Sequence, residues 1–123
     1  MAAVKIAKIC FIFFIKVRLD MTETEFIELA ESTLQRIQSA VEEVDEDLDV
    51  DRQGNVLTIE FDDGFQIVIN LQTPTRQIWL ASLKGGHHYE FCSSDWFDTS
   101  SKHSITEDLS ALLSKKLGRL VEL

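Results

Sequence analysis

The sequence predicts an α+β fold, a two-layer sandwich in which two terminal helices pack on one face of an antiparallel sheet of about six strands. Apolar residues recur at steps of three and four near both ends of residues 21–123, and they alternate with polar residues between those ends. The alternating segments are joined by hairpin-length turns, which imply antiparallel pairing. Since 45% of the 123 residues are hydrophobic, we expect one domain, residues 21–123, with a real core.

The first twenty residues do not match the rest of the chain. Their apolar run, residues 9–15, lies between lysines and is far shorter than the roughly 20 residues that span a bilayer. No small-residue cleavage site of a secretory signal follows it. We therefore expect the working protein to begin at Met21, residues 1–20 being an over-extended start. A membrane-touching anchor and an extra strand stay open as alternatives.

A first helix is predicted from Thr22 to Asp45. Thr22 and Glu25 form a capping box at its start. About six turns of helix then carry one apolar face. That face comprises Phe26, Leu29, Ala30, Leu34, Ile37, Val41 and Val44.

After Glu46 the pattern changes to a period of two, which indicates strands. Leu48 and Val50 alternate with acids that face outward. Turn signals at 53–55, 63–64, 73–75 and 85–86 separate the strands that follow. These strands are expected near residues 47–51, 56–61, 65–71, 77–82, 87–92 and 95–98.

A closing helix is predicted from a second capping box, Ser104 with Glu107, to a stop at Gly118. With both helices on one face of the sheet, the other face should stay wet. The residues expected there are Asp49, Asp51, Thr58, Glu60, Gln66, Asn70, Gln77 and Trp79.

The charge of the chain limits its partners. The formal net charge is −9, and residues 21–123 alone hold 8 basic and 20 acidic residues, a net of −12. Such a body repels phosphate backbones, so we expect no nucleic-acid binding. A cation or a basic protein surface is the natural partner. Two cysteines are too few for a disulfide-rich secreted domain, and we expect a cytoplasmic protein without a membrane contact in residues 21–123.

Acidic residues crowd one stretch, in which seven of the ten residues from Glu42 to Asp51 are acids. Negative charge at the end of a helix opposes the helix dipole, and a solvated face is the default explanation for any charge run. Yet the acids cover exposed positions of both a helix end and the following strand. Carboxylates alone suit hard or borderline cations held weakly, or a Lys/Arg-rich surface. We call this set the acidic ridge: Glu42, Glu43, Asp45, Asp47, Asp49 and Asp51.

A calcium-binding module is a weaker alternative within the same stretch. Residues 49–60 place Asp49, Asp51, Gln53, Gly54 and Glu60 at EF-hand loop positions 1, 3, 5, 6 and 12. An EF-hand needs a helix on each side of the loop, whereas the period of two predicts a strand on each side. Gly54 is better explained as a hairpin residue.

The sequence gives little support to an enzyme, and we predict no catalytic residue. Cys92 with a histidine base is conceivable, but neighbouring residues of a strand point to opposite faces, so His87 and His88 cannot both converge on it. We expect these histidines and His103 to be surface residues. No cysteine and histidine spacing fits a zinc site.

Trp79 is a candidate partner-binding residue. Ile78 and Leu80 are predicted to be buried, so Trp79 faces outward, and a large aromatic in a polar row is typical of an interface anchor. A loop or the N-terminal extension covering it is the alternative. The partner-binding row predicted here is Asn70, Gln72, Gln77 and Trp79.

The run from Asn70 to Ala81, NLQTPTRQIWLA, followed by Gly85-Gly86, resembles the signature of the frataxin family, bacterial CyaY type. The order of helix, meander and helix agrees, as does the acidic end of the first helix, and the resemblance extends from Met21 to about Gly118. The run is specific, whereas the acidic stretch alone would not be. Glu46 and residues 1–20 depart from the family pattern. Ile27 stands where some relatives have a histidine linked to iron.

The resemblance implies the frataxin fold and a non-enzymatic role in iron–sulfur cluster assembly. By position, the six residues of the acidic ridge would bind ferrous or ferric iron weakly and dock on a complex of cysteine desulfurase and cluster scaffold. The row with Trp79 matches the family's exposed sheet surface. The protein is expected to be a monomer without iron that regulates assembly or delivers iron. An iron-storage oligomer with ferroxidase chemistry is the alternative.

Overall fold

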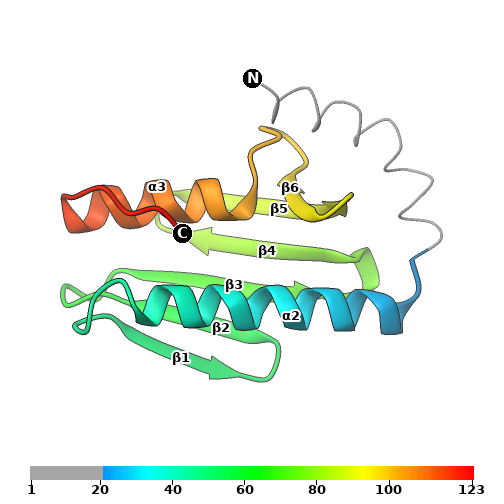
Figure 1. The fold of residues 1–123 in the computed structure, drawn as a ribbon, viewed down its shortest axis with the longest axis horizontal. Helices are drawn as coiled ribbons and strands as arrows, with labels where there is room; N and C mark the ends of the chain where they lie inside the picture. Colours follow the sequence, from blue (N-terminus) through cyan, green and yellow to red (C-terminus); the bar gives the residue numbers. More distant parts are fainter. Residues whose placement is uncertain (1–20) are drawn as a thin grey trace.

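A computed structural model describes residues 21–123, and it confirms the predicted two-layer α+β sandwich. Helices α2 (Glu23–Glu42) and α3 (Ile105–Leu117) run along one face of a six-stranded antiparallel sheet (Figure 1). The predicted extension, residues 1–20, lies outside the described residues. That the domain begins at Met21 therefore stays a prediction.

The sheet is a simple meander in which each strand pairs with the next one in the chain. The strand order is β1-β2-β3-β4-β5-β6, so β1 and β6 are the edges. Short connections suffice because every pairing is antiparallel. The strands are β1 (Asp49–Gln53), β2 (Val56–Glu60), β3 (Gln66–Gln72), β4 (Gln77–Ser82), β5 (Gly85–Cys92) and β6 (Asp95–Asp98).

Helix α2 begins as the capping box predicts, since the Thr22 hydroxyl accepts the N–H of Glu25 at 3.1 Å. Its apolar face is buried against the sheet. The helix ends at Glu42 and not at Asp45, and residues up to Leu48 form turns. Like charges near the C-terminus oppose the helix dipole, which is consistent with the earlier end.

The glycine pair Gly85-Gly86 was expected to interrupt the chain, but both residues belong to β5. Gly85 pairs with Ser82 and Gly86 with Ala81. The turn between β4 and β5 is formed by Leu83 and Lys84. Gly85 has φ +135°, a conformation that other residues rarely adopt, so it lets β5 start directly after the tight turn.

Helix α3 begins at the second predicted capping box, where Ser104 accepts the N–H of Glu107, and it ends at Gly118 with φ +68°. The tail then turns back along the helix (Figure 1). Val121 N–H donates to the Ser114 hydroxyl at 2.8 Å. The tail thus adds Val121 to the core, a contact that the sequence pattern did not predict.

The core lies between the sheet and the two helices and includes one buried polar link. Trp96 of β6 is fully buried and donates its indole N–H to the Thr33 hydroxyl of α2 at 2.8 Å. A buried indole N–H needs such a partner. In residues 21–123, neither helix is both long and apolar enough to cross a bilayer.

Candidate functional site

The acidic ridge follows the C-terminal end of α2, the turn after it and β1. Five of its side chains are exposed and Asp45 is half-buried. Because β1 is an edge strand among residues 21–123, no other strand of this described part pairs with its outer side. Alternation along β1 leaves Asp49 and Asp51 exposed while Val50 packs against the core.

Hydrogen bonds in the ridge are local. The N–H of Asp47 donates to Asp45 Oδ1 at 2.9 Å, which shapes the turn between α2 and β1. The guanidinium of Arg119 lies 3.7 Å from Asp45 Oδ2 and also donates to the Val44 carbonyl at 2.7 Å. The residue that follows α3 and its Gly118 cap therefore brings one positive charge to Asp45 of the ridge.

The turn between β2 and β3 adds acids that the sequence analysis did not assign to this region. Asp62 and Asp63 line a shallow pocket of about 220 Å³ together with Asp45 and Asp47 of the ridge. From the sequence, Asp63 is predicted only as a turn residue. Its proximity to the ridge depends on how the loops at one end of the sandwich pack, so sequence spacing carries no signal for it.

Lys116 of α3 is the basic side chain of this pocket. Its ammonium lies 2.5 Å from Asp63 Oδ2 and 4.6 Å from the centroid of the Phe65 ring. The hydrogen bond from Lys116, joined by one from the Phe65 N–H, lowers the pKa of Asp63 from its usual value.

The ridge does not form a compact ligand group. Among residues 21–123, no three carboxylates of the ridge bring ligand atoms together closely enough to chelate one ion. Its charge is spread along a surface, which suits weak and exchangeable cations better than a fixed metal.

The EF-hand alternative fails on the fold, as expected. Residues 49–60 are a β-hairpin in which Asp49 pairs directly with Glu60, the two ends of the supposed loop. Gly54 has φ +58° and belongs to the hairpin turn. No entering and leaving helices flank this segment, which runs from β1 into β2.

The four predicted partner-binding residues form a two-by-two block on β3 and β4. Asn70 pairs with Trp79 and Gln72 with Gln77, and all four side chains are half-buried. Gln72 donates to Asn70 Oδ1 at 2.7 Å, and the Trp79 indole N–H donates to Gln77 Oε1 at 2.8 Å. We call these residues the Trp79 block.

Strand β5 extends this surface. The His88 ring stacks on Trp79 with centroids 4.3 Å apart, and Gln77 donates to Glu90 Oε1 at 2.7 Å. The residues that surround Trp79 on this face are therefore polar, as the alternation in the sequence predicts. A stacked and hydrogen-bonded indole has few orientations, which favours recognition by reducing the entropy lost on binding.

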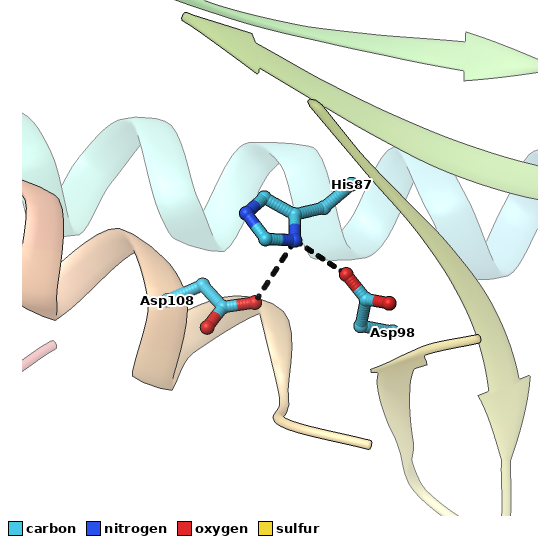
Figure 2. Close-up of side chains that lie close together, drawn as sticks. All are labelled: His87, Asp98 and Asp108. Atoms are coloured by element: carbon cyan, nitrogen blue, oxygen red, sulfur yellow. Dashed lines mark hydrogen bonds and ion pairs between the residues drawn. The ribbon is translucent and has the colours of Figure 1, made fainter. Parts of the chain in front are cut away.

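A second group of acids, missed by the sequence analysis, surrounds His87. His87 Nδ1 lies 2.5 Å from Asp98 Oδ2 and 3.9 Å from Asp108 Oδ2, and the three side chains point toward one another (Figure 2). They come from β5, β6 and the first turn of α3. We call them the His87 cluster. His87 is thus not an ordinary surface histidine, although alternation correctly separates it from His88.

Each carboxylate of the His87 cluster also accepts hydrogen bonds from groups other than His87. Asp98 Oδ1 accepts the N–H groups of Ser100 and Ser101 at 2.7 and 3.2 Å. Burial would raise the pKa of Asp98, but these bonds and the His87 ring outweigh it and lower the pKa. The buried Tyr89 hydroxyl donates to Asp108 Oδ2 at 2.6 Å, and burial followed by this bond raises the pKa of Tyr89.

Known proteins share this architecture and much of this sequence. A family model described as a frataxin-like domain matches residues 19–119. An iron-sulfur cluster assembly protein CyaY from Vibrio cholerae is 51% identical over 76 residues, which is 62% of this chain and 73% of the relative. The protein of that name from Psychromonas ingrahamii is 38% identical over 102 residues, with 83% and 97% covered.

Solved structures agree in fold. The frataxin structure from Psychromonas ingrahamii superimposes with a TM-score of 0.78 at 38% identity and covers 83% of this chain and 97% of its own. Trimeric yeast frataxin complexed with ferrous iron gives a TM-score of 0.66 at 28% identity, covering 74% and 87%. Together with the match over residues 19–119, these similarities show that the chain belongs to the frataxin-like family.

Proposed function

We propose that this chain is a non-enzymatic, iron-binding regulator or iron chaperone of iron–sulfur cluster assembly. It acts in the cytoplasm, as a monomer when no iron is bound. The acidic ridge captures ferrous or ferric iron reversibly and docks on a basic surface of the cysteine desulfurase, while the Trp79 block contacts the scaffold protein. The names of its relatives, which are iron-sulfur cluster assembly proteins, support the pathway.

The exposure of the ridge is the observation that carries this proposal. Six carboxylates lie along a helix end and an edge strand without converging on one point. Repulsion among them is relieved when a cation or a basic surface approaches, and this gain drives association. An arrangement without a chelating geometry releases iron readily, as delivery or sensing requires.

The decisive experiment neutralises the whole ridge with Glu→Gln and Asp→Asn substitutions at its six positions. Iron binding is measured by titration and desulfurase binding by calorimetry at low salt. We expect both to weaken at least tenfold. If both survive the loss of all six charges, the proposed role of the ridge is wrong.

A matched pair of variants distinguishes the effect of the ridge's position from the effect of net charge. One carries Glu42→Gln, Glu43→Gln, Asp47→Asn and Asp49→Asn, and we call it the ridge-four variant. The control removes four exposed acids elsewhere: Glu23→Gln, Glu28→Gln, Glu107→Gln and Glu122→Gln. Both change the net charge equally, so only the ridge-four variant should lose desulfurase affinity. Equal losses would indicate net charge alone.

The Trp79 block is tested by Trp79→Ala in a pull-down with desulfurase and scaffold. Interface anchors of this kind contribute about 2 kcal/mol or more, so scaffold capture should fall by more than tenfold. Ile27→Ala is the control, because Ile27 is an apolar side chain, 40% exposed, on the helix layer. If the wild-type chain and both variants capture the scaffold equally, the Trp79 block does not contact the scaffold.

Iron storage with ferroxidase chemistry is the second candidate. It is favoured by the yeast relative, which is a trimer complexed with ferrous iron. It needs oligomers and a defined pair of irons, whereas the ridge carboxylates form no compact group. Size measurement with iron and oxygen discriminates the two: growth into large iron-loaded particles would favour storage.

A further inference from the structure

The His87 cluster brings together three side chains that the proposed function does not use. Within residues 21–123, it is the group of at least three possible metal ligands whose donor atoms lie within 4.8 Å of one another. We propose that His87 Nδ1, Asp98 Oδ2 and Asp108 Oδ2 form a second cation site, which takes a borderline divalent transition-metal ion such as zinc, cobalt or ferrous iron.

The spacing of the donor atoms is close to what such an ion needs. Bonds of about 2.0–2.1 Å in a tetrahedral arrangement separate neighbouring ligand atoms by roughly 3.3 Å. His87 Nδ1 lies 2.5 Å from Asp98 Oδ2 and 3.9 Å from Asp108 Oδ2. Small side-chain rotations therefore bring all three into range. The His87 side chain is the ligand best able to rotate, since it is 36% exposed.

The charge of the group also favours a divalent ion. The Asp98 and Asp108 side chains are only 4% and 14% exposed, so both carboxylates are partly removed from water. His87 Nδ1 can donate a single proton, and the geometry gives that hydrogen bond to Asp98. Asp108 instead accepts the Tyr89 hydroxyl on Oδ2 and has Nδ1 of the exposed His103 ring 3.3 Å from Oδ1. A divalent ion replaces this proton and neutralises both carboxylates at once.

The ligands are already oriented, as metal ligands usually are by a surrounding shell of hydrogen bonds. The N–H groups of Ser100 and Ser101 hold Asp98 Oδ1, which leaves Oδ2 aimed at His87. The Tyr89 hydroxyl fixes Asp108 Oδ2 at 2.6 Å. Figure 2 shows that the three ligand side chains come from different elements, so the folded domain itself positions them.

The donor set selects the class of metal. An imidazole nitrogen with two carboxylate oxygens suits zinc, cobalt and ferrous iron, while calcium and magnesium prefer oxygen ligands alone. Three protein ligands leave at least one position for water or a partner's ligand. This site is separate from the acidic ridge, which is built on α2 and β1, and it does not rest on the role proposed for the ridge.

The test uses the full chain, freed of metal, titrated with Co²⁺ and followed by visible absorption and calorimetry. We expect one Co²⁺ to bind with the intense absorption of a low-coordinate ion and to be displaced by Zn²⁺. His87→Ala should weaken this binding at least tenfold, and Asp108→Asn should do the same. His88→Ala removes a histidine from the same strand on the opposite sheet face and should leave the affinity within twofold. Far-ultraviolet circular dichroism checks that each variant is folded.

The ridge-four variant separates this inference from the proposed function. It should retain the Co²⁺ absorption and affinity of the His87 cluster, even where its ridge iron binding is lost. The inference is overturned if the wild-type chain binds no low-coordinate Co²⁺, or if folded His87→Ala and Asp108→Asn variants bind it unchanged. Neither result would affect desulfurase docking through the ridge.

Discussion

The acidic ridge and the His87 cluster are both built from carboxylates, but they hold their charge in different ways. Ridge side chains are mostly exposed, come from one ten-residue segment, and do not converge. In the His87 cluster, two largely buried carboxylates from β6 and α3 face one imidazole from β5, and hydrogen bonds orient them. Exposed carboxylates such as those of the ridge interact with a partner mainly through their summed charge, which salt screens. Largely buried carboxylates such as Asp98 and Asp108 interact mainly through individual hydrogen bonds and ion pairs, which salt affects little.

The largest difference should appear when the same substitution is made in both regions. Asp98→Ala leaves the N–H groups of Ser100 and Ser101 without their buried acceptor, so we expect a loss of about 3 kcal/mol in the free energy of unfolding. Asp47→Ala removes an exposed charge and should stay within about 0.5 kcal/mol. Urea denaturation measures both. Similar values for the two variants would show that the two regions do not differ in this way.

Tyr89→Phe removes the hydroxyl that donates a hydrogen bond to Asp108 of the His87 cluster. The buried hydrogen bond to Asp108 is lost, which should reduce the free energy of unfolding by about 1 kcal/mol. Loss of an orienting partner should also weaken Co²⁺ binding about tenfold. Iron binding by the ridge serves as the internal control and should not change. If ridge binding changes as well, the two sites are coupled.

Salt should act on the ridge and leave the cluster almost untouched. Raising the ionic strength from about 0.1 to about 1 M shortens the Debye length from roughly 10 to 3 Å, which screens repulsion between exposed acids. We expect the ridge to contribute about 0.5 kcal/mol of added stability over this range. The ridge-four variant should show a smaller gain in thermal or urea denaturation. An equal gain would place the salt effect elsewhere in the chain.

The smallest effect concerns the exposed pair beside the ridge, Asp63 and Lys116. The pKa of Asp63 is lowered in the folded state, mainly by its hydrogen bond from Lys116. Its contribution to stability is therefore fully present above the unfolded pKa, near 3.8, and is lost as the pH falls through the lower folded value. Urea midpoints measured down the acid range should decline slightly less steeply for Asp63→Asn. A steeper decline would contradict the assigned direction.

The sequence by itself determined the fold class and the order of elements. Both depend on local rules: apolar periods of 3.6 and 2, capping boxes at Thr22 and Ser104, and turn residues between strands. The density of acids located the ridge, but the choice of its six residues also used the family resemblance, and their role stays a prediction. The Trp79 block could also be proposed from alternation along β3 and β4, whereas its cross-strand pairs come from the register that the structure shows.

Only the tertiary structure decided the His87 cluster and the position of Asp62 and Asp63 in one pocket with Asp45 and Asp47 of the ridge. The cluster requires the strand register that pairs Asp98 with Tyr89, the residue that follows His87 on the same face of β5. It also requires α3 to pack with its first turn over β5. Residues 11 and 10 positions apart on three different elements leave no periodic signal. Local sequence determines which way a side chain faces on its own element, but the packing of elements determines which side chains meet.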